Sequence, residues 1–431
     1  MKKVKEYLGK LKGNAAVCIG AHPFWAVPYM FYTYYISLYL QERGITDIQL
    51  GTLMVAGTVS ATFFSFLAAP IVDRLGRRNA TSLFDFLSSA LPPLLYFFTR
   101  DFGLALVAMV LFNANRLMSV GYFLVMIEDS EDDGRIVALN MFNIITVVAG
   151  LLLPLAGVYV EKRGLVKGEE TFLLASFFVI TAMIIVRHIL LKETRVGEAV
   201  REKVKAEPAG IGTTVKQLWT PYRDALKFLM KNPVARAFTV ANVFFCVYMN
   251  LGTNYSLYFV PYFSDRMGMD TMQISVLGSI YYGGMLAAMV FINPVFSRKN
   301  LVKGILISCG VTLAGFLLMI FVPSGVYVLA IGATAVLALG YGMLKSSLEG
   351  AFAVYSESEY RSGIYSAANL LSSGLGVIVT AICSVMYGKD ARWLYILNGI
   401  MVLAVLITIF HVSRKHDLTK IGNKEEADNV L

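Results

Sequence analysis

Long uninterrupted apolar stretches restrict what this sequence can fold into. A transmembrane helix needs about 20 consecutive, mostly apolar residues, and twelve stretches of this kind follow one another along the 431 residues. The sequence therefore predicts an all-α polytopic membrane protein with twelve transmembrane helices. The stretches cover residues 18–42, 50–72, 80–98, 102–127, 136–160, 171–191, 234–263, 274–296, 301–322, 325–355, 362–387 and 393–412.

A charged segment separates the first six stretches from the last six. We divide the chain into an N-terminal six-helix bundle (1–191), a linker (192–233), a C-terminal six-helix bundle (234–413) and a short tail (414–431). Part of the linker, residues 213–231, places Trp219, Tyr222 and Phe228 among basic residues. This pattern predicts an amphipathic helix on the membrane surface.

The positive charges lie between the apolar stretches. The chain is 57% hydrophobic and only 16% charged, and its formal net charge of +9 is not gathered into one basic patch, which argues against nucleic-acid binding. Most lysines and arginines fall on the side of the N-terminus, so the positive-inside rule predicts cytoplasmic termini. The first apolar run is too long for a signal peptide. Together with the short outer loops, this favours a multi-pass protein of a bacterial inner membrane, surrounded by the lipid bilayer.

The two halves repeat each other. Residues around the end of the first stretch recur around the end of the seventh at one constant offset, and residues just before and within the fifth stretch recur just before and within the eleventh. Equivalent helices an even number apart cross the membrane in the same direction, so the halves are predicted to be parallel repeats. The first set is Tyr32, Tyr35, Tyr39, Glu42 and Arg43 with Tyr255, Tyr258, Tyr262, Asp265 and Arg266; the second is Ser130, Glu131, Asp133, Arg135, Asn143 and Gly150 with Ser356, Glu357, Glu359, Arg361, Asn369 and Gly376.

The loop between the second and third helices carries a family resemblance. Residues 69–78 read A-P-I-V-D-R-L-G-R-R, which resembles the signature G-x-L-x-D-R-x-G-R/K of the major facilitator superfamily, with Ala69 in place of the leading glycine. Glu128 and Arg135 resemble the family's E-x6-R element. The resemblance implies two six-helix bundles and a cytoplasmic gate formed by Asp73, Arg74, Gly76, Arg77, Glu128 and Arg135. Ser297 stands where the second half would have the signature aspartate, so the gate is predicted to be asymmetric.

The resemblance also implies a central cavity lined by helices 1, 4, 7 and 10. Arg116 lies near the middle of helix 4, where an unpaired cation costs about 3 kcal/mol, so we expect it to face this cavity. Lys345 and Glu349 are one turn apart on helix 10, where they can form an ion pair or meet substrate. Tyrosines and one asparagine on helices 1 and 7 are further candidates, although aromatic stripes also serve packing or the membrane interface: Tyr32, Tyr35, Asn254, Tyr255 and Tyr258.

Glu349 is the candidate proton carrier, because burial and a neighbouring cation change the proton affinity of a carboxyl group in opposite directions. The alternative is a permanent ion pair with Lys345. Asp85 in helix 3 is a second candidate, but its nearness to the basic loop predicts pairing with Arg77 or Arg78. Two cationic centres beside one carboxylate favour an anionic or amphipathic solute.

Three functions compete. The leading hypothesis is a monomeric secondary transporter that works by alternating access and exports an amphipathic or anionic compound in exchange for protons. Gly150-x3-Pro154-x2-Gly157 in helix 5 supports export, because it partly resembles an element of the family's antiporters; close packing and a bend at Pro154 are the alternative explanation. Proton-coupled uptake of an organic anion or sugar-like solute and a transporter-like membrane sensor are the other hypotheses.

An enzyme is not expected. The sequence contains no G-x4-G-K-[ST], H-E-x-x-H or G-x-S-x-G motif. Its four cysteines are far apart and have no metal-ligand spacing with histidine. We therefore expect no cofactor and no metal site, only a small-molecule substrate and protons.

Overall fold

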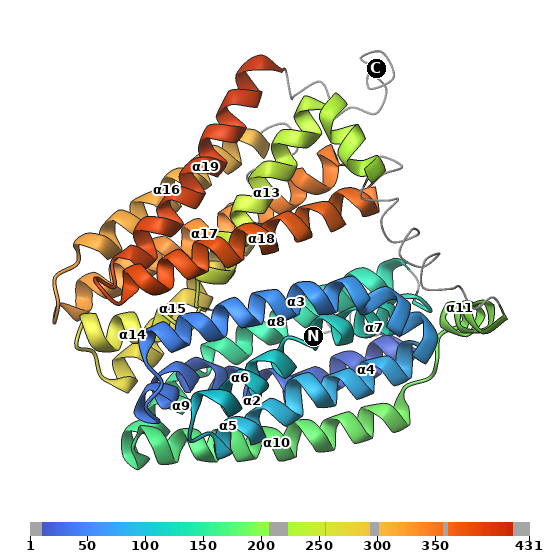
Figure 1. The fold of residues 1–431 in the computed structure, drawn as a ribbon, viewed down its shortest axis with the longest axis horizontal. Coiled ribbons are helices and arrows are strands. Elements are labelled where there is room, and N and C mark those ends of the chain that lie inside the picture. The colour runs from blue at the N-terminus through green and yellow to red at the C-terminus, as the bar shows by residue number, and fades with distance from the viewer. Residues whose placement is uncertain are drawn as a thin grey trace. The chain divides into compact units, whose positions relative to one another are not determined.

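The chain folds into two compact helical units, Met1–Ala209 and Gly210–Leu431, called here the N-terminal and C-terminal units (Figure 1). The computed structural model describes residues 11–130, 132–206, 223–254, 256–293, 301–356 and 361–416. Within these ranges the regular structure is helical throughout. The all-α fold class predicted from the sequence is confirmed.

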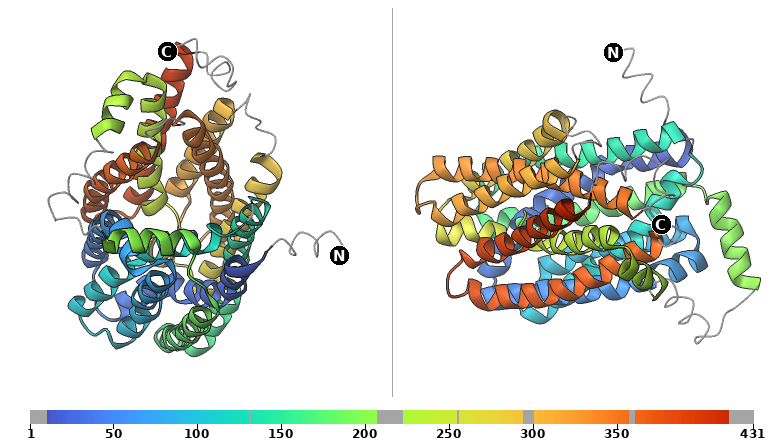
Figure 2. Two further views of the ribbon diagram at one scale, coloured as in Figure 1. Left: turned by 90° about the vertical axis from the view of Figure 1, so that its right-hand side faces the viewer. Right: turned by 90° about the horizontal axis from the view of Figure 1, so that it is seen from above.

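The N-terminal unit contains the first six expected helices, some of them in two or three pieces. Helix α11 follows them and lies crosswise to the bundle in both further views (Figure 2). The elements are α2 (Gly13–Glu42), α3 (Asp47–Leu75), α4 (Arg77–Asp85), η1 (Phe86–Ala90), α5 (Leu91–Phe98), α6 (Phe102–Phe112), α7 (Asn115–Ile127), α8 (Asp132–Leu151), α9 (Leu153–Arg163), α10 (Leu165–Leu190) and α11 (Arg195–Ala206).

The C-terminal unit contains the other six. Residues 223–231 of the predicted amphipathic segment are helical, while Trp219 and Tyr222 lie outside the described residues. The elements are α13 (Pro233–Leu251), α14 (Phe259–Pro261), η2 (Tyr262–Arg266), α15 (Thr271–Ala287), η3 (Ala288–Ile292), α16 (Leu301–Phe321), α17 (Tyr327–Tyr355), α18 (Arg361–Tyr387) and α19 (Trp393–Lys415).

Ten helices in the described part of the chain are long and apolar enough to cross a membrane. The first and third expected spans also form helices but fall outside this set. Tyrosines make α2 less apolar, and α4 begins with Arg77 and Arg78. Twelve helices remain consistent with the structure.

Prolines explain two interruptions within the bundle. Pro92 and Pro93 have no N–H to donate to the carbonyl groups one turn earlier, and the helix widens there into η1. Pro154 occupies the first turn of α9, directly after the break that separates α9 from α8. This break is what the alternative explanation of the Gly150–Gly157 element, a bend at Pro154, implies.

Glycines allow the closest helix contacts, as expected where apolar lipid gives no drive for helices to associate and packing must supply it. At Gly340 in α17, an added Cβ atom would lie 2.7 Å from the backbone nitrogen of Thr312 in α16. At Gly315 in α16, it would lie 2.8 Å from the Cα atom of Leu337. Backbone atoms cannot yield as a flexible side chain does, so α16 and α17 depend on these glycines.

This contact predicts the effect of a larger residue in α17. Gly340→Leu should destabilise the C-terminal unit by about 3 kcal/mol, the cost of overpacking a close contact, and should lower the thermal unfolding temperature of the detergent-solubilised protein. Gly332→Leu is the matched control, because Gly332 lies in the same helix and an added Cβ meets nothing within 4 Å. Equal unfolding temperatures for the two variants would contradict the packing argument.

Candidate functional site

The turn between α3 and α4 requires glycine for two reasons. Gly76 has φ +86°, a conformation that residues with a side chain rarely adopt. A Cβ atom at this position would also collide with the carboxylate of Glu193. The chain therefore passes from α3 into α4 in one residue, with Arg77 starting the new helix.

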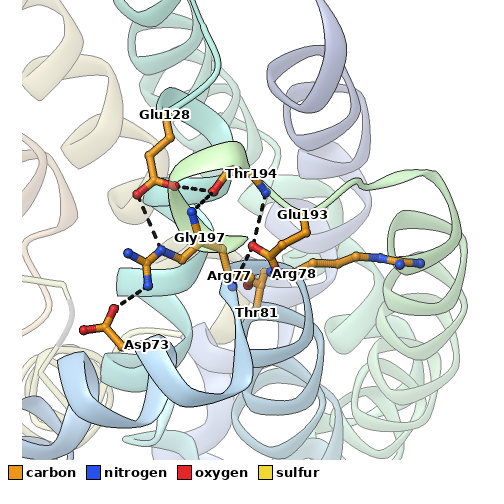
Figure 3. A network of polar contacts seen from close by, with 8 residues as sticks. All are labelled: Asp73, Arg77, Arg78, Thr81, Glu128, Glu193, Thr194 and Gly197. Carbon is orange, nitrogen blue, oxygen red and sulfur yellow. Dashed lines mark hydrogen bonds and ion pairs between the residues drawn. The ribbon is translucent and has the colours of Figure 1, made fainter. Parts of the chain in front are cut away.

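The guanidinium of Arg77, directly after this turn, contacts two carboxylates (Figure 3). Its side chain is only 6% exposed; its guanidinium forms an ion pair with Asp73 of α3, and its Nε lies 3.4 Å from Oε1 of Glu128 at the end of α7. A buried cation is tolerated only when it is paired and hydrogen-bonded. The structure thus brings together three residues of the predicted gate, and Arg77 depends on the other two.

Glu193, directly after α10, caps the start of α4. Its Oε1 accepts a hydrogen bond from the backbone N–H of Arg77 at 2.9 Å, and its Oε2 accepts one from the backbone N–H of Arg78 at 3.2 Å. The first N–H groups of a helix have no partner within the helix, and negative charge is favoured at that end. One carboxylate therefore satisfies two backbone donors.

Thr194 connects the same point to α7 and α11. Its hydroxyl donates to Glu128 and accepts from the backbone N–H of Gly197 at 2.9 Å, in the first turn of α11. The residue is completely buried. Sequence reasoning missed Glu193 and Thr194, although a threonine preceding a charged helical run is a recognisable N-cap signal.

The neighbouring Arg78 and the remaining gate residues, Arg74 and Arg135, have different surroundings. The Arg78 side chain donates from Nε and Nη2 to the carbonyl oxygen of His188, at 3.0 and 2.7 Å, and so covers the end of α10. Arg74 is exposed in the last turn of α3. The side chain of Arg135 and residue Ser297 lie outside the described residues.

Asp85 does not pair with the basic loop, and that prediction is wrong. Its carboxylate lies 2.6 Å from the guanidinium of Arg187 in α10, and both side chains are buried. Arg77 is eight residues away on the same helix, which is roughly 12 Å along the axis. Arg187 comes from the neighbouring helix at the same depth, so tertiary packing selects it.

The tyrosines of α2 belong to the interior. Tyr32 and Tyr35 are 1% and 0% exposed. The hydroxyl of Tyr32 is within electrostatic range of Tyr96 and Glu169, which belong to α5 and α10. This placement favours the packing interpretation for Tyr32. Arg116, by contrast, is exposed in the first turn of α7, directly after the break between α6 and α7.

Lys345 and Glu349 lie on one face of α17 without forming a direct ion pair. Lys345 is half-buried and Glu349 is exposed. The structure has no contact of 4 Å or less between the ammonium and the carboxylate of these two described residues, although they are within electrostatic range. The direct pair considered from their spacing is not formed in this conformation.

The seventh predicted helix is interrupted after α13, within the apolar stretch 234–263 that is predicted to cross the membrane, a feature that the apolar pattern did not predict. Regular helix ends at Leu251 and resumes at Phe259. Gly252 approaches α19 closely, since an added Cβ would lie 2.5 Å from Cγ of Asn398. Non-helical backbone at this depth is tolerated where protein encloses it or where it lines a cavity, as in transporter binding sites. In the sequence, the available indication of this break was Gly252 followed two residues later by Asn254.

Asn254 lies within this interruption. Its side-chain oxygen is buried and accepts no hydrogen bond from the described residues. Tyr258 is completely buried, and its ring stacks on that of Tyr387 with centroids 4.3 Å apart. Tyr255 lies outside the described residues. Of the candidates on helix 7, Asn254 therefore retains unused hydrogen-bonding capacity.

Comparison with known proteins agrees with this architecture. A POT family transporter crystallised with a thioalcohol-conjugated peptide matches with a TM-score of 0.69 and 15% identity, over 95% of this chain and 99% of that chain. The nucleoside transporter NupG matches with a TM-score of 0.66 and 13% identity, over 94% and 99%. A peptide transporter POT in complex with sulfate matches with a TM-score of 0.66 and 14% identity, over 94% and 95%. These identities establish a shared fold.

Family membership rests on the sequence itself. Among curated proteins, no sequence matches this chain. The family model of the Major Facilitator Superfamily matches residues 18–362, which is most of the chain. The resemblance carried by the signature loop is thereby confirmed, and the protein belongs to the Major Facilitator Superfamily.

Proposed function

We propose that the protein is a secondary active transporter that moves a small organic solute by alternating access. The observation that carries this proposal is the polar network around Arg77, which joins the signature loop, the end of α7 and the start of α11 (Figure 3). Alternating access needs contacts that stabilise one arrangement of the cytoplasmic helix ends and can be exchanged for others. Charge-assisted hydrogen bonds at partly exposed helix ends meet that requirement.

The network assigns the beginning of the linker to the N-terminal unit. Glu193 and Thr194 bond to α4 and α7, so α11 starts from a position fixed relative to both helices. A conformational change that moves α11 therefore acts directly on the first turn of α4. In this proposal, Asp73, Gly76, Arg77 and Glu128 form the cytoplasmic gate together with Glu193 and Thr194.

The solute is proposed to be an amphipathic or anionic compound, exported in exchange for protons. Arg116 and Lys345 supply positive charge, and Asn254 supplies an unused hydrogen-bond acceptor within interrupted helix 7. Neighbours named as peptide and nucleoside transporters make polar solutes of that size part of the screen. Uptake by symport and a sensor are the alternatives.

Glu349 is the proposed proton carrier. No described residue forms an ion pair with its exposed carboxylate, while Lys345 one turn earlier keeps a cation within electrostatic range. A carboxylate that is not held in a permanent pair can take up and release a proton as substrate enters. We further propose a monomer in a cell inner membrane with cytoplasmic termini.

Proton flux tests this proposal. Proteoliposomes with a pH-sensitive dye inside should respond to at least one compound from a panel of organic anions, sugars, aromatic drugs, dipeptides and nucleosides. When the compound is added outside, antiport should make the lumen more alkaline and symport should make it more acidic. Glu349→Gln should reduce the flux at least tenfold, while Glu202→Gln, at an exposed position of α11, should leave it unchanged. No flux with any compound, despite ligand-induced thermal stabilisation, would favour a sensor or a uniporter.

The cap on α4 gives a second test. Glu193→Ala leaves two helix-end N–H groups without their partner, which costs about 1–3 kcal/mol, so amide hydrogen exchange at residues 77–81 and 195–206 should accelerate. The control is Glu202→Ala, whose side chain is exposed on α11. If both variants exchange at the wild-type rate in these segments, Glu193 does not fix the linker.

A further inference from the structure

A second carboxyl group, Glu169, is enclosed in the N-terminal unit without a partner. It lies in the second turn of α10, at the end that the predicted topology places on the outer side of the membrane. The residue is 0% exposed, and neither carboxyl oxygen accepts a hydrogen bond from any residue that the structure describes. The next residue behaves differently, because Glu170 forms an ion pair with Arg43 directly after α2.

The polar neighbour of the Glu169 carboxyl is a tyrosine hydroxyl. The hydroxyl of Tyr32 in α2 is buried, has no hydrogen-bond partner among the described residues and is within electrostatic range of Glu169. Tyr29 of the same helix and Tyr96 of α5 are within range of that hydroxyl as well. Helix α10 packs against both α2 and α5, so these groups share one interior region.

Charged groups on the other neighbouring helices lie elsewhere. From α9, Val160 packs on Gly168, whereas the charged residues 161–163 at the end of that helix are exposed. Helix α4 contributes Asp85, which pairs with Arg187, 18 residues along α10 and roughly 27 Å away. Element η1 has no ionisable side chain. No residue that the structure describes forms a hydrogen bond or an ion pair with the Glu169 carboxyl.

The surroundings of Glu169 favour its neutral, protonated form over the ionised carboxylate. An ionised group enclosed without a counter-ion or hydrogen bonds costs several kcal/mol. The protonated acid has an O–H donor and a carbonyl acceptor, and the Tyr32 hydroxyl offers a complementary donor and acceptor. The two groups are therefore chemically suited to bond to each other once the acid is protonated. The ion pair of Glu170 with Arg43, one residue away, is partly exposed.

We propose that Glu169 is a proton-binding site of the N-terminal unit, occupied when the ends of α2, α5 and α10 pack as in this structure and emptied when those ends separate. Separation admits water, which solvates the carboxylate, and the proton leaves toward the outer side. Repacking requires protonation first. The role of this site in transport rests on the proton coupling proposed above; its existence does not.

Infrared difference spectroscopy tests the site without any substrate. Purified protein in lipid nanodiscs should show the carbonyl-stretch band of a buried carboxylic acid, and the band should diminish as the pH is raised. Glu169→Gln should remove this band. The matched control is Glu170→Gln, which changes the adjacent, ion-paired carboxylate and should keep it. A band that is the same in Glu169→Gln as in wild type would overturn the proposal, and so would a band that persists at every pH at which the protein stays folded.

Tyr32→Phe keeps the experiment decisive if Glu169→Gln fails to fold. Removing the hydroxyl should shift the frequency of the acid band, because the carboxyl loses its hydrogen-bond partner, and an unshifted band would contradict the assigned neighbour. Proteoliposome flux separates this proposal from the proposed function. A carboxylic-acid band without proton flux would support the proton site at Glu169 and contradict its coupling to transport. Proton flux without this band would support the proposed transporter and contradict a proton site at Glu169.

Discussion

The buried guanidinium of Arg77 is the interaction on which the cytoplasmic end of the N-terminal unit depends. Its charge lies at the point where α3, α4 and α7 meet, so it needs counter-charge from more than one helix. Asp73 and Glu128 supply that charge. Glu193 then occupies the remaining space above Gly76, where any side chain would exclude it. Glycine at position 76 thus serves the turn and the cap together.

The sequence predicted the contacts of this network between residues that are close together in the chain, and missed the contacts between residues that are far apart in the chain. Asp73, Gly76 and Arg77 lie within one turn and follow a recognised spacing, so their proximity followed from the pattern. Glu193 comes from more than 100 residues later, and its contact is with backbone N–H groups, which exist in every residue and leave no trace in a sequence. The same limit applies to Asp85: nearness along the chain suggested Arg77, while the packing of α10 supplied Arg187.

The presence of the helices could be predicted from the sequence, but the breaks within them could be predicted only in part. Apolar length sets the number of spans, because each must cover the hydrocarbon layer. The helix break next to Pro154 could be predicted, because the missing N–H of a proline weakens the helix that contains it. The break in helix 7 depends instead on the approach of α19 to Gly252, where Asn398 leaves no room for a Cβ atom. A glycine within an apolar run does not by itself distinguish such an approach from ordinary packing.

In the proposed transporter, Glu349 and Glu169 would hold an exchangeable proton in two different ways. Glu349 is exposed and has a cation one turn away, so substrate that competes for Lys345 would change its charge balance. Glu169 is buried and accepts no hydrogen bond from the described residues, so in this proposal the packing of the surrounding helices, and not a ligand, would determine whether its charge is tolerated. Protonation of Glu349 would depend on whether substrate is bound, and protonation of Glu169 would depend on how the surrounding helices pack. Coupling requires both dependences, because a proton gradient drives transport only if protonation depends on what is bound and on which side is open.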